Sequence, residues 1–245
     1  MTAVSLRDRI RCPATKAPYV RRLFDTIAGR YDLVTRVLSY GQDRRWKRRL
    51  VAMAGPLEGR SAADLACGTG DIAALLSEAG AGPVIGLDVV PRMIGLARAR
   101  LAGRPADIRF VVGDMCDLPF PDASFDVVTT GYGLRNVPDL HRAVREAARV
   151  LRPGGIFLSL DFSRPQSFWL RSVYHGYLTA VGSLLGWVLH RDAETYRYIP
   201  ESIRHYPGAP AVARILGRHG FVEARWHPVL GGLLAIHTAR RRGEG

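Results

Sequence analysis

Three acidic residues mark short apolar runs in the middle of the chain, at nearly equal intervals. Asp64 precedes the loop in DLACGTGD, Asp88 follows VIGL, and Asp114 follows VVG, so the intervals are 24 and 26 residues. Each interval has the length of one strand and one helix, and a carboxylate at a strand end can accept hydrogen bonds from both ribose hydroxyls. We expect this role for Asp88, whereas Asp114 is placed to accept from an exocyclic adenine amine. The spacing predicts a nucleoside site.

The glycine loop between the first strand and its helix differs from a dinucleotide loop. Gly68-Thr69-Gly70 is followed by Asp-Ile-Ala, so the third glycine of the pattern GxGxxG is missing. Asp64 and Asp71 flank this loop, and carboxylates repel phosphate groups, which helix N-termini otherwise attract. The loop therefore favours a cationic or zwitterionic nucleoside ligand.

Apolar runs and helical stretches alternate through the middle of the chain. Strands are expected at residues 61–66, 83–88, 108–112, 125–130 and 155–162, with helices at 72–79, 91–102 and 140–151. Two more strands are expected within 221–240, where His227-Pro228 and Gly231-Gly232 mark the turn. This pattern predicts an α/β fold with a mostly parallel, seven-stranded sheet flanked by helices, and with ligands at the carboxyl ends of the strands.

The chain divides into a basic, helical segment at residues 1–60 and a sheet domain at 61–245, with a helical insertion at about 163–205. Residues 1–60 hold 14 Lys or Arg against 5 Asp or Glu, and the whole chain has a net charge of +13. Such a segment can attract nucleic acid or an anionic membrane, or it can be a solvated helix face. Since the sequence has no RNA-binding motif, nucleic acid is not an expected partner.

Other compositional features exclude several classes of protein. The three cysteines are scattered, so neither a disulfide framework nor a metal site is expected. No secretory signal is recognised at the N-terminus. The longest apolar run, residues 178–189, is shorter than the roughly 20 residues needed to span a bilayer.

The loop and its ordered acids resemble the S-adenosylmethionine-dependent methyltransferases of the Rossmann-like class I, over residues 61–162. The resemblance implies that 61–245 is a methyltransferase domain and that S-adenosylmethionine is its cofactor. It implies the following cofactor-binding residues: Asp64, Ala66, Gly68, Thr69, Gly70, Asp88, Val89, Met93, Asp114, Met115 and Thr130.

Four flanking segments narrow this resemblance to the UbiE/COQ5 family of quinone-biosynthesis C-methyltransferases, over about residues 24–241. They are FDTIAGRYDLVTRVLSYGQDRRWKRRL from Phe24, TTGYGLRNVPD from Thr129, YRYIPESIRHYP from Tyr196, and GGLLAIHTARR from Gly231. The resemblance implies methyl transfer to a ring carbon of a prenylated quinol, with demethylmenaquinol to menaquinol as the main expectation. A ubiquinone precursor is an alternative. Val34-Thr35 replaces the usual Met-Asn or Leu-Asn, which leaves open a soluble phenolic acceptor.

The resemblance also implies roles on the acceptor side. Arg135 is expected to stabilise a phenolate and Asn136 to orient the ring, although Asn136 could instead shape a turn and Arg135 could lie on the surface. Asp161 is a candidate base, and so, more weakly, is His205. The expected acceptor-binding residues are Tyr31, Tyr132, Arg135, Tyr196 and Tyr206.

The expected partners are a lipid quinol and an anionic membrane surface. The basic N-terminal segment and the aromatic insertion together suggest docking on the inner face of the cytoplasmic membrane, by a protein otherwise in the cytoplasm. A homodimer is left open. The rival interpretations are a methyltransferase for a soluble phenol, an RNA-binding protein, and a module that binds the cofactor without chemistry.

Overall fold

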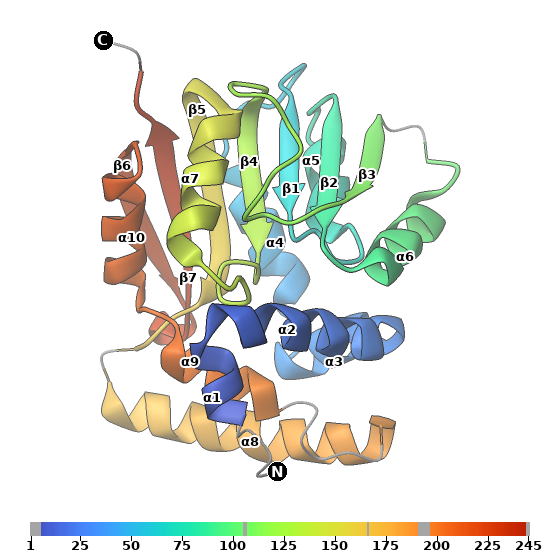
Figure 1. The fold of residues 1–245 in the computed structure, drawn as a ribbon, viewed down its shortest axis with the longest axis vertical. Helices are drawn as coiled ribbons and strands as arrows, with labels where there is room; N and C mark the ends of the chain where they lie inside the picture. Colours follow the sequence, from blue (N-terminus) through green and yellow to red (C-terminus); the bar gives the residue numbers. More distant parts are fainter. Residues whose placement is uncertain (1–5, 105–106, 166, 191–196, 244–245) are drawn as a thin grey trace.

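The computed structural model describes residues 6–104, 107–165, 167–190 and 197–243, and its centre is a seven-stranded sheet (Figure 1). The strands are β1 Ala62–Leu65, β2 Val84–Asp88, β3 Ile108–Val112, β4 Phe125–Gly131, β5 Leu151–Phe162, β6 Phe221–Val229 and β7 Leu234–Arg241. Their order is β3-β2-β1-β4-β5-β7-β6. The first five strands are parallel, and β7 pairs antiparallel with both β5 and β6. This arrangement confirms the predicted fold class.

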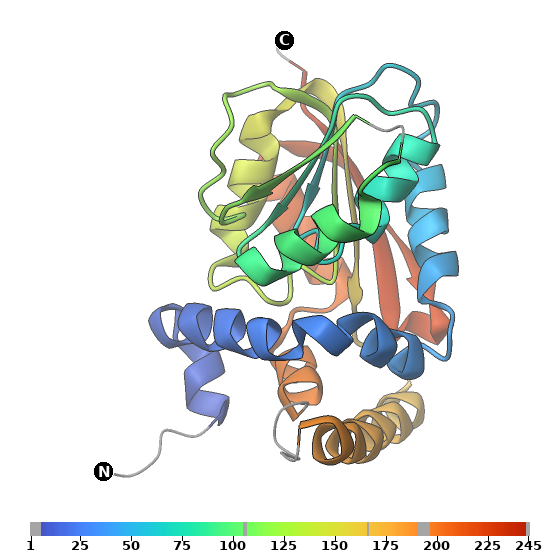
Figure 2. The ribbon, with the colours of Figure 1, turned by 90° about the vertical axis from the view of Figure 1, so that its right-hand side faces the viewer.

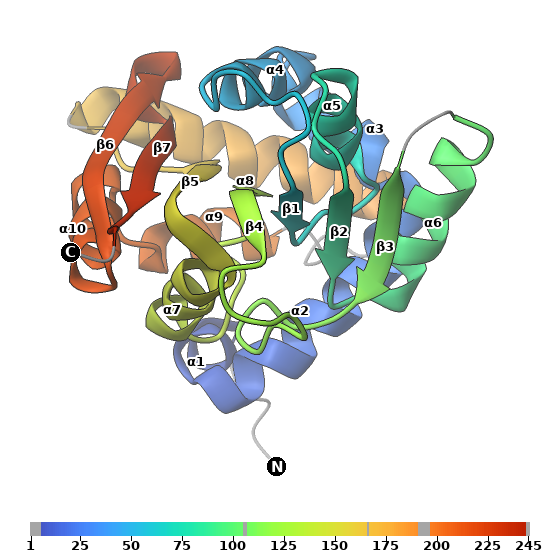
Figure 3. The same cartoon turned by 90° about the horizontal axis from the view of Figure 1, so that it is seen from above.

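Helices cover both faces of the sheet (Figure 3). One face packs against α4 Asp43–Ala52, α5 Asp71–Glu78 and α6 Pro91–Leu101, and the other against α7 Leu140–Val150 and α10 Ala209–Arg218. The sequence analysis assigned no element to α10. Its signals are a proline in the first turn and the apolar spacing of Val212, Ala213 and Leu216, all of which are buried.

A third layer of helices lies across the carboxyl ends of the parallel strands (Figures 1 and 2). It contains α1 Leu6–Arg11, α2 Pro13–Ile27, the short 3-10 helix Ala28–Arg30, α3 Tyr31–Leu38, α8 Phe168–His190 and α9 Tyr198–His205. Within this layer, α8 is outermost and α9 lies between it and the sheet. The N-terminal segment and the insertion thus meet at the end of the sheet where ligands bind in α/β proteins.

The turn between the last two strands differs from the prediction. His227 and Pro228 lie inside β6, where Pro228 pairs with Ala235 of β7. The chain reverses instead at Leu230–Gly232, where both glycines have positive φ. A proline is tolerated in β6 because this strand is the edge of the sheet, where strands most readily accept one.

Candidate active site

A cavity of about 270 Å³ opens where β1, β2, β3 and β4 end. We call it the strand-end cavity. Seven of the predicted cofactor residues line it: Ala66, Gly68, Asp88, Val89, Met93, Asp114 and Met115. Helix α2 closes one side with Ala17, Pro18, Val20, Arg21 and Phe24. The strand ends therefore supply the carboxylates of the cavity, and the N-terminal helix supplies a cover that includes Arg21.

Asp88 ties the glycine loop to the end of β2. Its Oδ2 accepts a hydrogen bond from the Gly68 N–H at 2.9 Å, and its Oδ1 accepts from the Val90 N–H at 2.9 Å. Burial raises the pKa of this carboxyl, although these backbone donors act in the opposite direction. Each carboxylate oxygen has a second lone pair, so Asp88 can still accept from a ligand in the cavity.

The loop reaches Asp88 because its backbone turns through left-handed conformations. Ala66, Gly68 and Gly70 have φ values of 54°, 55° and 84°. A Cβ on Gly70 would lie 3.0 Å from the Phe110 ring, so this position requires glycine on two grounds. Ala66 lacks that freedom, and its left-handed backbone is a local strain in the wall of the cavity.

Asp64 and the remaining loop residues support the loop from below and do not line the strand-end cavity. Asp64 is 1% exposed, and it accepts from the Thr129 hydroxyl at 2.9 Å and from the Ala73 N–H at 3.2 Å. Burial raises its pKa to about 7. The Thr69 hydroxyl donates to Asp32 at 2.8 Å. These contacts fix the loop. Asp64 and Thr69 also line a small pocket of about 20 Å³ that shares Ala66 and Gly68 with the strand-end cavity, so their role toward the cofactor stays a prediction.

Asp71, the carboxylate at the other end of the loop, is paired with two cations of the protein. Its carboxylate lies 2.8 Å from the Lys47 ammonium and forms a second ion pair with Arg100. Its charge is therefore already balanced by the protein and cannot by itself select a cationic ligand. Thr130, a further predicted cofactor residue, is fully buried beneath Gly133 and lies outside the cavity lining.

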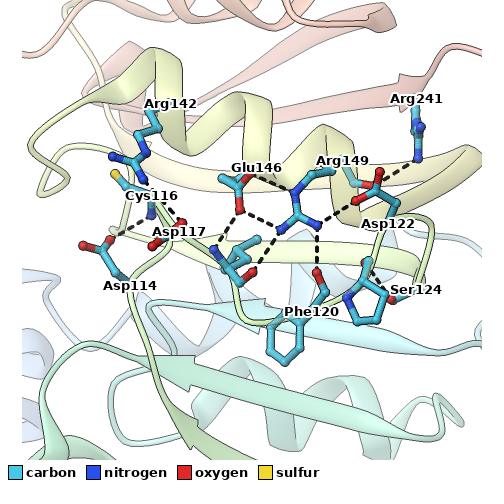
Figure 4. A network of polar contacts seen from close by, with 12 residues as sticks. Asp114, Cys116, Asp117, Phe120, Asp122, Ser124, Arg142, Glu146, Arg149 and Arg241 are labelled. Carbon is cyan, nitrogen blue, oxygen red and sulfur yellow. Dashed lines mark hydrogen bonds and ion pairs between the residues drawn. The ribbon is translucent and has the colours of Figure 1, made fainter.

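The segment that carries Asp114 and Met115 is anchored to α7 (Figure 4). Asp114 accepts from the Cys116 N–H at 2.8 Å. Farther along, Arg149 of α7 donates to the carbonyls of Leu118 and Phe120 at 3.0 and 2.7 Å. Arg149 also pairs with a carboxylate of its own helix, and its hydrogen bond lowers the pKa of that group, Glu146. The helix thereby holds the long β3–β4 connection in place.

A second cavity of about 70 Å³ adjoins the first, and we call it the aromatic cavity. Its aromatic walls come from the helical layer, α4, the loop after β4 and the end of β5: Phe24, Tyr31, Trp46, Tyr132, Phe162, Tyr174 and Tyr198. Arg135 and Asn136 also line it. Four residues line both cavities: Phe24, Tyr31, Tyr132 and Asn136. The two spaces therefore share a wall from which either ligand can be contacted.

Arg135 is buried, so the alternative that it lies on the surface is wrong. Its side chain is 5% exposed and lies against the Phe162 ring, with 4.9 Å between the guanidinium carbon and the ring centre. The backbone N–H of Arg135 donates to Asp161 at 2.9 Å, and the side-chain Nε lies 3.5 Å from the same carboxylate. The Nη1 of the guanidinium donates to the Ser202 hydroxyl. Cation–π contact and one carboxylate thus hold a positive charge at the aromatic cavity.

Asn136 both shapes the turn and borders the two cavities. Its Nδ2 donates to the Tyr132 carbonyl at 2.7 Å, and its Oδ1 accepts from the Tyr198 hydroxyl at 2.9 Å. The amide nitrogen has two N–H groups, and these contacts use one of them, so the other can donate to a ligand.

Asp161 does not border either cavity among the residues that the structure describes. Its oxygens accept from the N–H groups of Arg135 and Phe162, both within 2.9 Å. Burial raises its pKa, which the Arg135 charge opposes. The structure therefore places Asp161 as the partner of Arg135 and not as a base in contact with an acceptor.

Of the other residues predicted to bind the acceptor, some line the aromatic cavity and others lie elsewhere. Tyr31 and Tyr132 line the aromatic cavity, whereas Tyr206 lies in the core between α7 and α10. Tyr196 falls outside the described residues. His205 turns toward α1, where Arg11 donates to its ring at 3.3 Å, so it is not a base in this geometry.

Two lysines to which no sequence motif assigned a role also reach the site. Lys16 of α2 donates to the carbonyls of Arg135 and Val137 at 2.9 and 2.7 Å. Burial lowers its pKa to about 8, and the Arg135 charge adds to this effect. The sequence did contain a signal for these two positions, because Lys16 and Lys47 are the only lysines among 35 basic residues.

Lys47 lies in a buried charge network below Tyr132. Its ammonium lies 2.5 Å from Asp43 and 2.8 Å from Asp71, and Asp43 accepts from the Tyr132 hydroxyl at 2.8 Å. Burial disfavours the charge, yet the two carboxylates raise the pKa of Lys47 above its ordinary value. This network fixes Tyr132, whose backbone φ of 59° is strained, in the wall between the cavities.

Comparison with known proteins places this geometry in a family. The chain is 39% identical to a demethylmenaquinone methyltransferase of Thermus thermophilus, over 89% of this chain and 100% of the relative. It is also 39% identical to a ubiquinone/menaquinone biosynthesis C-methyltransferase UbiE of Rubrivivax gelatinosus, over 91% and 86% of the two chains.

Solved structures share the fold. A SAM-dependent methyltransferase of Thermotoga maritima, described as a possible histamine N-methyltransferase, matches with a TM-score of 0.66 and 21% identity, over 91% of this chain and 100% of that one. The phosphoethanolamine N-methyltransferase 2 of Haemonchus contortus, in complex with S-adenosyl-L-methionine, matches with a TM-score of 0.62 and 14% identity, over 81% and 52% of the chains.

The family model of the ubiE/COQ5 methyltransferases matches residues 13–241, which include both cavities and all but the first residues of the helical layer. The chain therefore belongs to the ubiE/COQ5 methyltransferase family.

Proposed function

We propose that this enzyme transfers a methyl group from S-adenosylmethionine to a ring carbon of a prenylated quinol, with demethylmenaquinol as the acceptor. The observation that carries the proposal is the shared wall of Tyr31, Tyr132 and Asn136 between the two cavities. One cavity has strand-end carboxylates suited to a nucleoside, and the other has aromatic walls and a buried guanidinium suited to a phenolic ring. The name of the Thermus relative supports the choice of acceptor.

The residues of the strand-end cavity fit the methyl donor. Asp88 has lone pairs for ribose hydroxyls, and Asp114 and Met115 lie together at the end of β3. Gly68 and Gly131 let the backbone approach closely, because neither has a side chain in the lining. When bound, S-adenosylmethionine supplies a methyl group activated by its positive sulfur.

Arg135 is the group that stabilises charge on the acceptor. An aromatic carbon becomes a good nucleophile when the neighbouring hydroxyl loses its proton, so the site must stabilise a phenolate. The Arg135 Nε lies 3.5 Å from Asp161, so this edge of the guanidinium faces its own carboxylate. The rest of the group lines the aromatic cavity, where burial lowers the local dielectric constant and its positive charge acts strongly.

The tyrosines of the aromatic cavity orient the ring and do not serve as bases. Burial raises the pKa of Tyr31 to about 12 and also raises the pKa values of Tyr132 and Tyr198. These hydroxyls stay protonated near neutral pH. The Tyr132 and Tyr198 protons are already donated to Asp43 and Asn136, so these two rings orient the acceptor by packing, and Tyr31 is the one of the three with a proton for an acceptor oxygen. The proton of the acceptor then leaves through water beside Arg135.

The test is a set of parallel methyl-transfer assays with labelled S-adenosylmethionine. We expect product with reduced demethylmenaquinone, and less with a reduced demethoxy-type benzoquinone precursor. A preference for the benzoquinone would move the enzyme to the ubiquinone pathway. Transfer only to a soluble phenol would contradict the lipid quinol and give weight to Thr35, which lines the aromatic cavity.

We also propose that the protein docks on the inner face of the cytoplasmic membrane through α8. None of the described helices is long and apolar enough to cross a membrane. On α8, however, Trp169 and Trp187 are 76% and 66% exposed, and Val173, Leu184 and Val188 are exposed as well. These five residues follow helical spacing along one side, which is typical of a helix that lies in the interface. Flotation with anionic vesicles tests this docking, and absence of binding would contradict it.

A further inference from the structure

A third cavity, of about 220 Å³, lies on the inner side of α8. We call it the arginine pocket. Three arginines contributed by different segments line it: Arg164 from the β5–α8 connection, Arg171 from α8 and Arg204 from α9. Its other walls are largely apolar: Pro165, Tyr174, Leu178, Ile203 and Leu233, with Ser163 beside them. Neither the cofactor nor the quinol ring requires this combination of charge and apolar surface.

The guanidinium groups retain donors for a ligand. Arg164 donates through Nη2 to the Arg204 carbonyl, and Arg204 Nη1 lies 3.4 Å from a carboxylate oxygen of Glu201. Each guanidinium has five N–H donors, so the contacts made within the described part of the chain leave most of the donors of Arg164 and Arg204 available. Arginine forks match the geometry of a phosphate group and bind it through paired hydrogen bonds.

Tyr174 connects the arginine pocket with the aromatic cavity, since it lines both. Leu178, one helical turn farther on, lines the arginine pocket and packs in one cluster with Ile27, Val34 and Leu38. Val34 and Leu38 also line the aromatic cavity. An apolar path thus leads from the ring site, past Tyr174, to the arginines.

The position of the pocket on α8 fits the depth of lipid phosphates. Tyr174 and Leu178, one helical turn apart, face inward, and Arg171 lines the same pocket at its exposed rim. Trp169 and Val173 are exposed on the other side. A helix is about 10 Å across, and an interfacial helix sinks roughly 5–10 Å into the boundary of headgroups and acyl chains. When the tryptophan side of α8 lies at this boundary, its inner side is level with the phosphates.

From these observations we propose that the arginine pocket binds the phosphate of an anionic phospholipid, with the start of one acyl chain against Leu178 and Leu233. The phosphate accepts hydrogen bonds from Arg164 and Arg204, and Arg171 adds positive charge. The bound lipid lies beside the exit of the quinol tail. The depth argument and the tail route rest on the proposed function, while the chemistry of the pocket does not.

The experiment measures binding of three probes to the full chain by calorimetry. The probes are dihexanoylphosphatidylglycerol below its micelle concentration, dihexanoylglycerol, which lacks the phosphate, and inorganic phosphate. We expect the phosphatidylglycerol to bind at least roughly tenfold more tightly than either of the others. Equal binding of inorganic phosphate would overturn the lipid assignment, and equal binding of dihexanoylglycerol would overturn the role of the arginines.

Variants assign the binding to the pocket. Arg164→Gln with Arg204→Gln is expected to weaken phosphatidylglycerol binding roughly tenfold or more. Arg214→Gln with Arg218→Gln, which removes the same charge from exposed positions of α10, is expected to leave it unchanged. The pair Arg164→Lys and Arg204→Lys keeps the charge and is the control for misfolding. It should retain part of the affinity for phosphatidylglycerol. Equal affinity of the glutamine and control variants would overturn the proposal.

Methyl transfer to a quinol without a tail, measured on the same samples, separates this inference from the proposed function. Loss of transfer in all samples, with arginine-dependent lipid binding intact, would contradict the proposed function alone. Transfer intact in the wild type and in the glutamine variant, without arginine-dependent lipid binding, would contradict the arginine pocket alone.

Discussion

The strand-end cavity and the aromatic cavity share a wall but are constructed in different ways. In the strand-end cavity, Asp88 is fixed by the N–H groups of its own turn and of the adjacent loop. In the aromatic cavity, Arg135 is held by Ser202 of α9, and its carbonyl by Lys16 of α2. The first site is thus a property of the sheet, whereas the second exists only when segments distant in the sequence have packed together.

The largest expected effect separates chemistry from cofactor binding. Arg135→Gln should lower kcat by about 10²–10³, because the phenolate loses its positive partner, while the Kd for S-adenosylmethionine changes little. Since the change also leaves the Asp161 carboxylate buried without its cation, the variant should be combined with Asp161→Asn. Steady-state kinetics and cofactor titration measure the two quantities.

The matched control for this change is Arg135→Lys, which keeps the charge but not the planar fork. It should recover part of the turnover. If the glutamine variant weakens cofactor binding as much as it lowers kcat, the two cavities are not separable as described.

Asp88→Asn tests the strand-end cavity. Replacing one acceptor by an NH₂ group sets a donor against the N–H of Gly68 or Val90 and removes the charge that accepts from the ribose. Cofactor Kd should rise about ten- to a hundredfold, with a smaller change in kcat. Asp117→Asn is the control, because Asp117 is an exposed acid of the next connection, paired with Arg142. Equal effects of the two substitutions would contradict the role of Asp88.

The same contrast explains what the sequence could predict. Positions such as Asp88 and Gly68 were predicted because a strand, a glycine turn and a carboxylate follow one another in the chain, and their contacts are local. The place of Asp64 in the strand before the loop was also predicted, but only the fold shows that Thr129 and Ala73 donate hydrogen bonds to its oxygens.

On the acceptor side, the sequence alone was less informative. The family resemblance pointed to Arg135 and Asn136, but spacing could not show that Lys16, 119 residues away, binds the carbonyl of Arg135. Nor could it show that Tyr206 packs into the core while Tyr198 lines the cavity, because the two lie on different sides of one short helix and its end. Such placements depend on tertiary packing.

Lys16→Met should weaken the connection between α2 and the acceptor loop. We expect a roughly tenfold lower kcat/KM for the acceptor, since the carbonyls on both sides of Asn136 lose a charged donor. The control is Arg22→Met, an exposed cation of the same helix. An equal loss in both variants would assign the effect to charge alone.

The titration of Lys16 gives a second readout that loss of packing would not imitate. Its pKa is lowered in the folded protein to about 8 from 10.5, so between these values the unfolded chain binds more protons. The free energy of unfolding of the wild type should therefore rise relative to Lys16→Met as the pH increases from about 8 toward 10.5, by roughly 2–3 kcal/mol. Urea unfolding at both ends of this range measures it, and a constant difference would contradict the buried amine.

The smallest effect concerns the outer surface of the helical layer. Trp169→Ser with Trp187→Ser should reduce partitioning onto anionic vesicles several-fold, because two exposed indoles no longer enter the interface. Transfer to a quinol without a tail should be unchanged, since neither residue is in the lining of either ligand cavity. Trp226→Ser, a change at an exposed tryptophan of β6, is the control for lost apolar surface. If the α8 variant instead lowers turnover with the soluble quinol, α8 shapes the aromatic cavity through Tyr174 more than it binds membrane. In that case the outermost helix would also belong to the acceptor site, which is formed by packed helices, whereas the methyl-donor site is formed by the sheet.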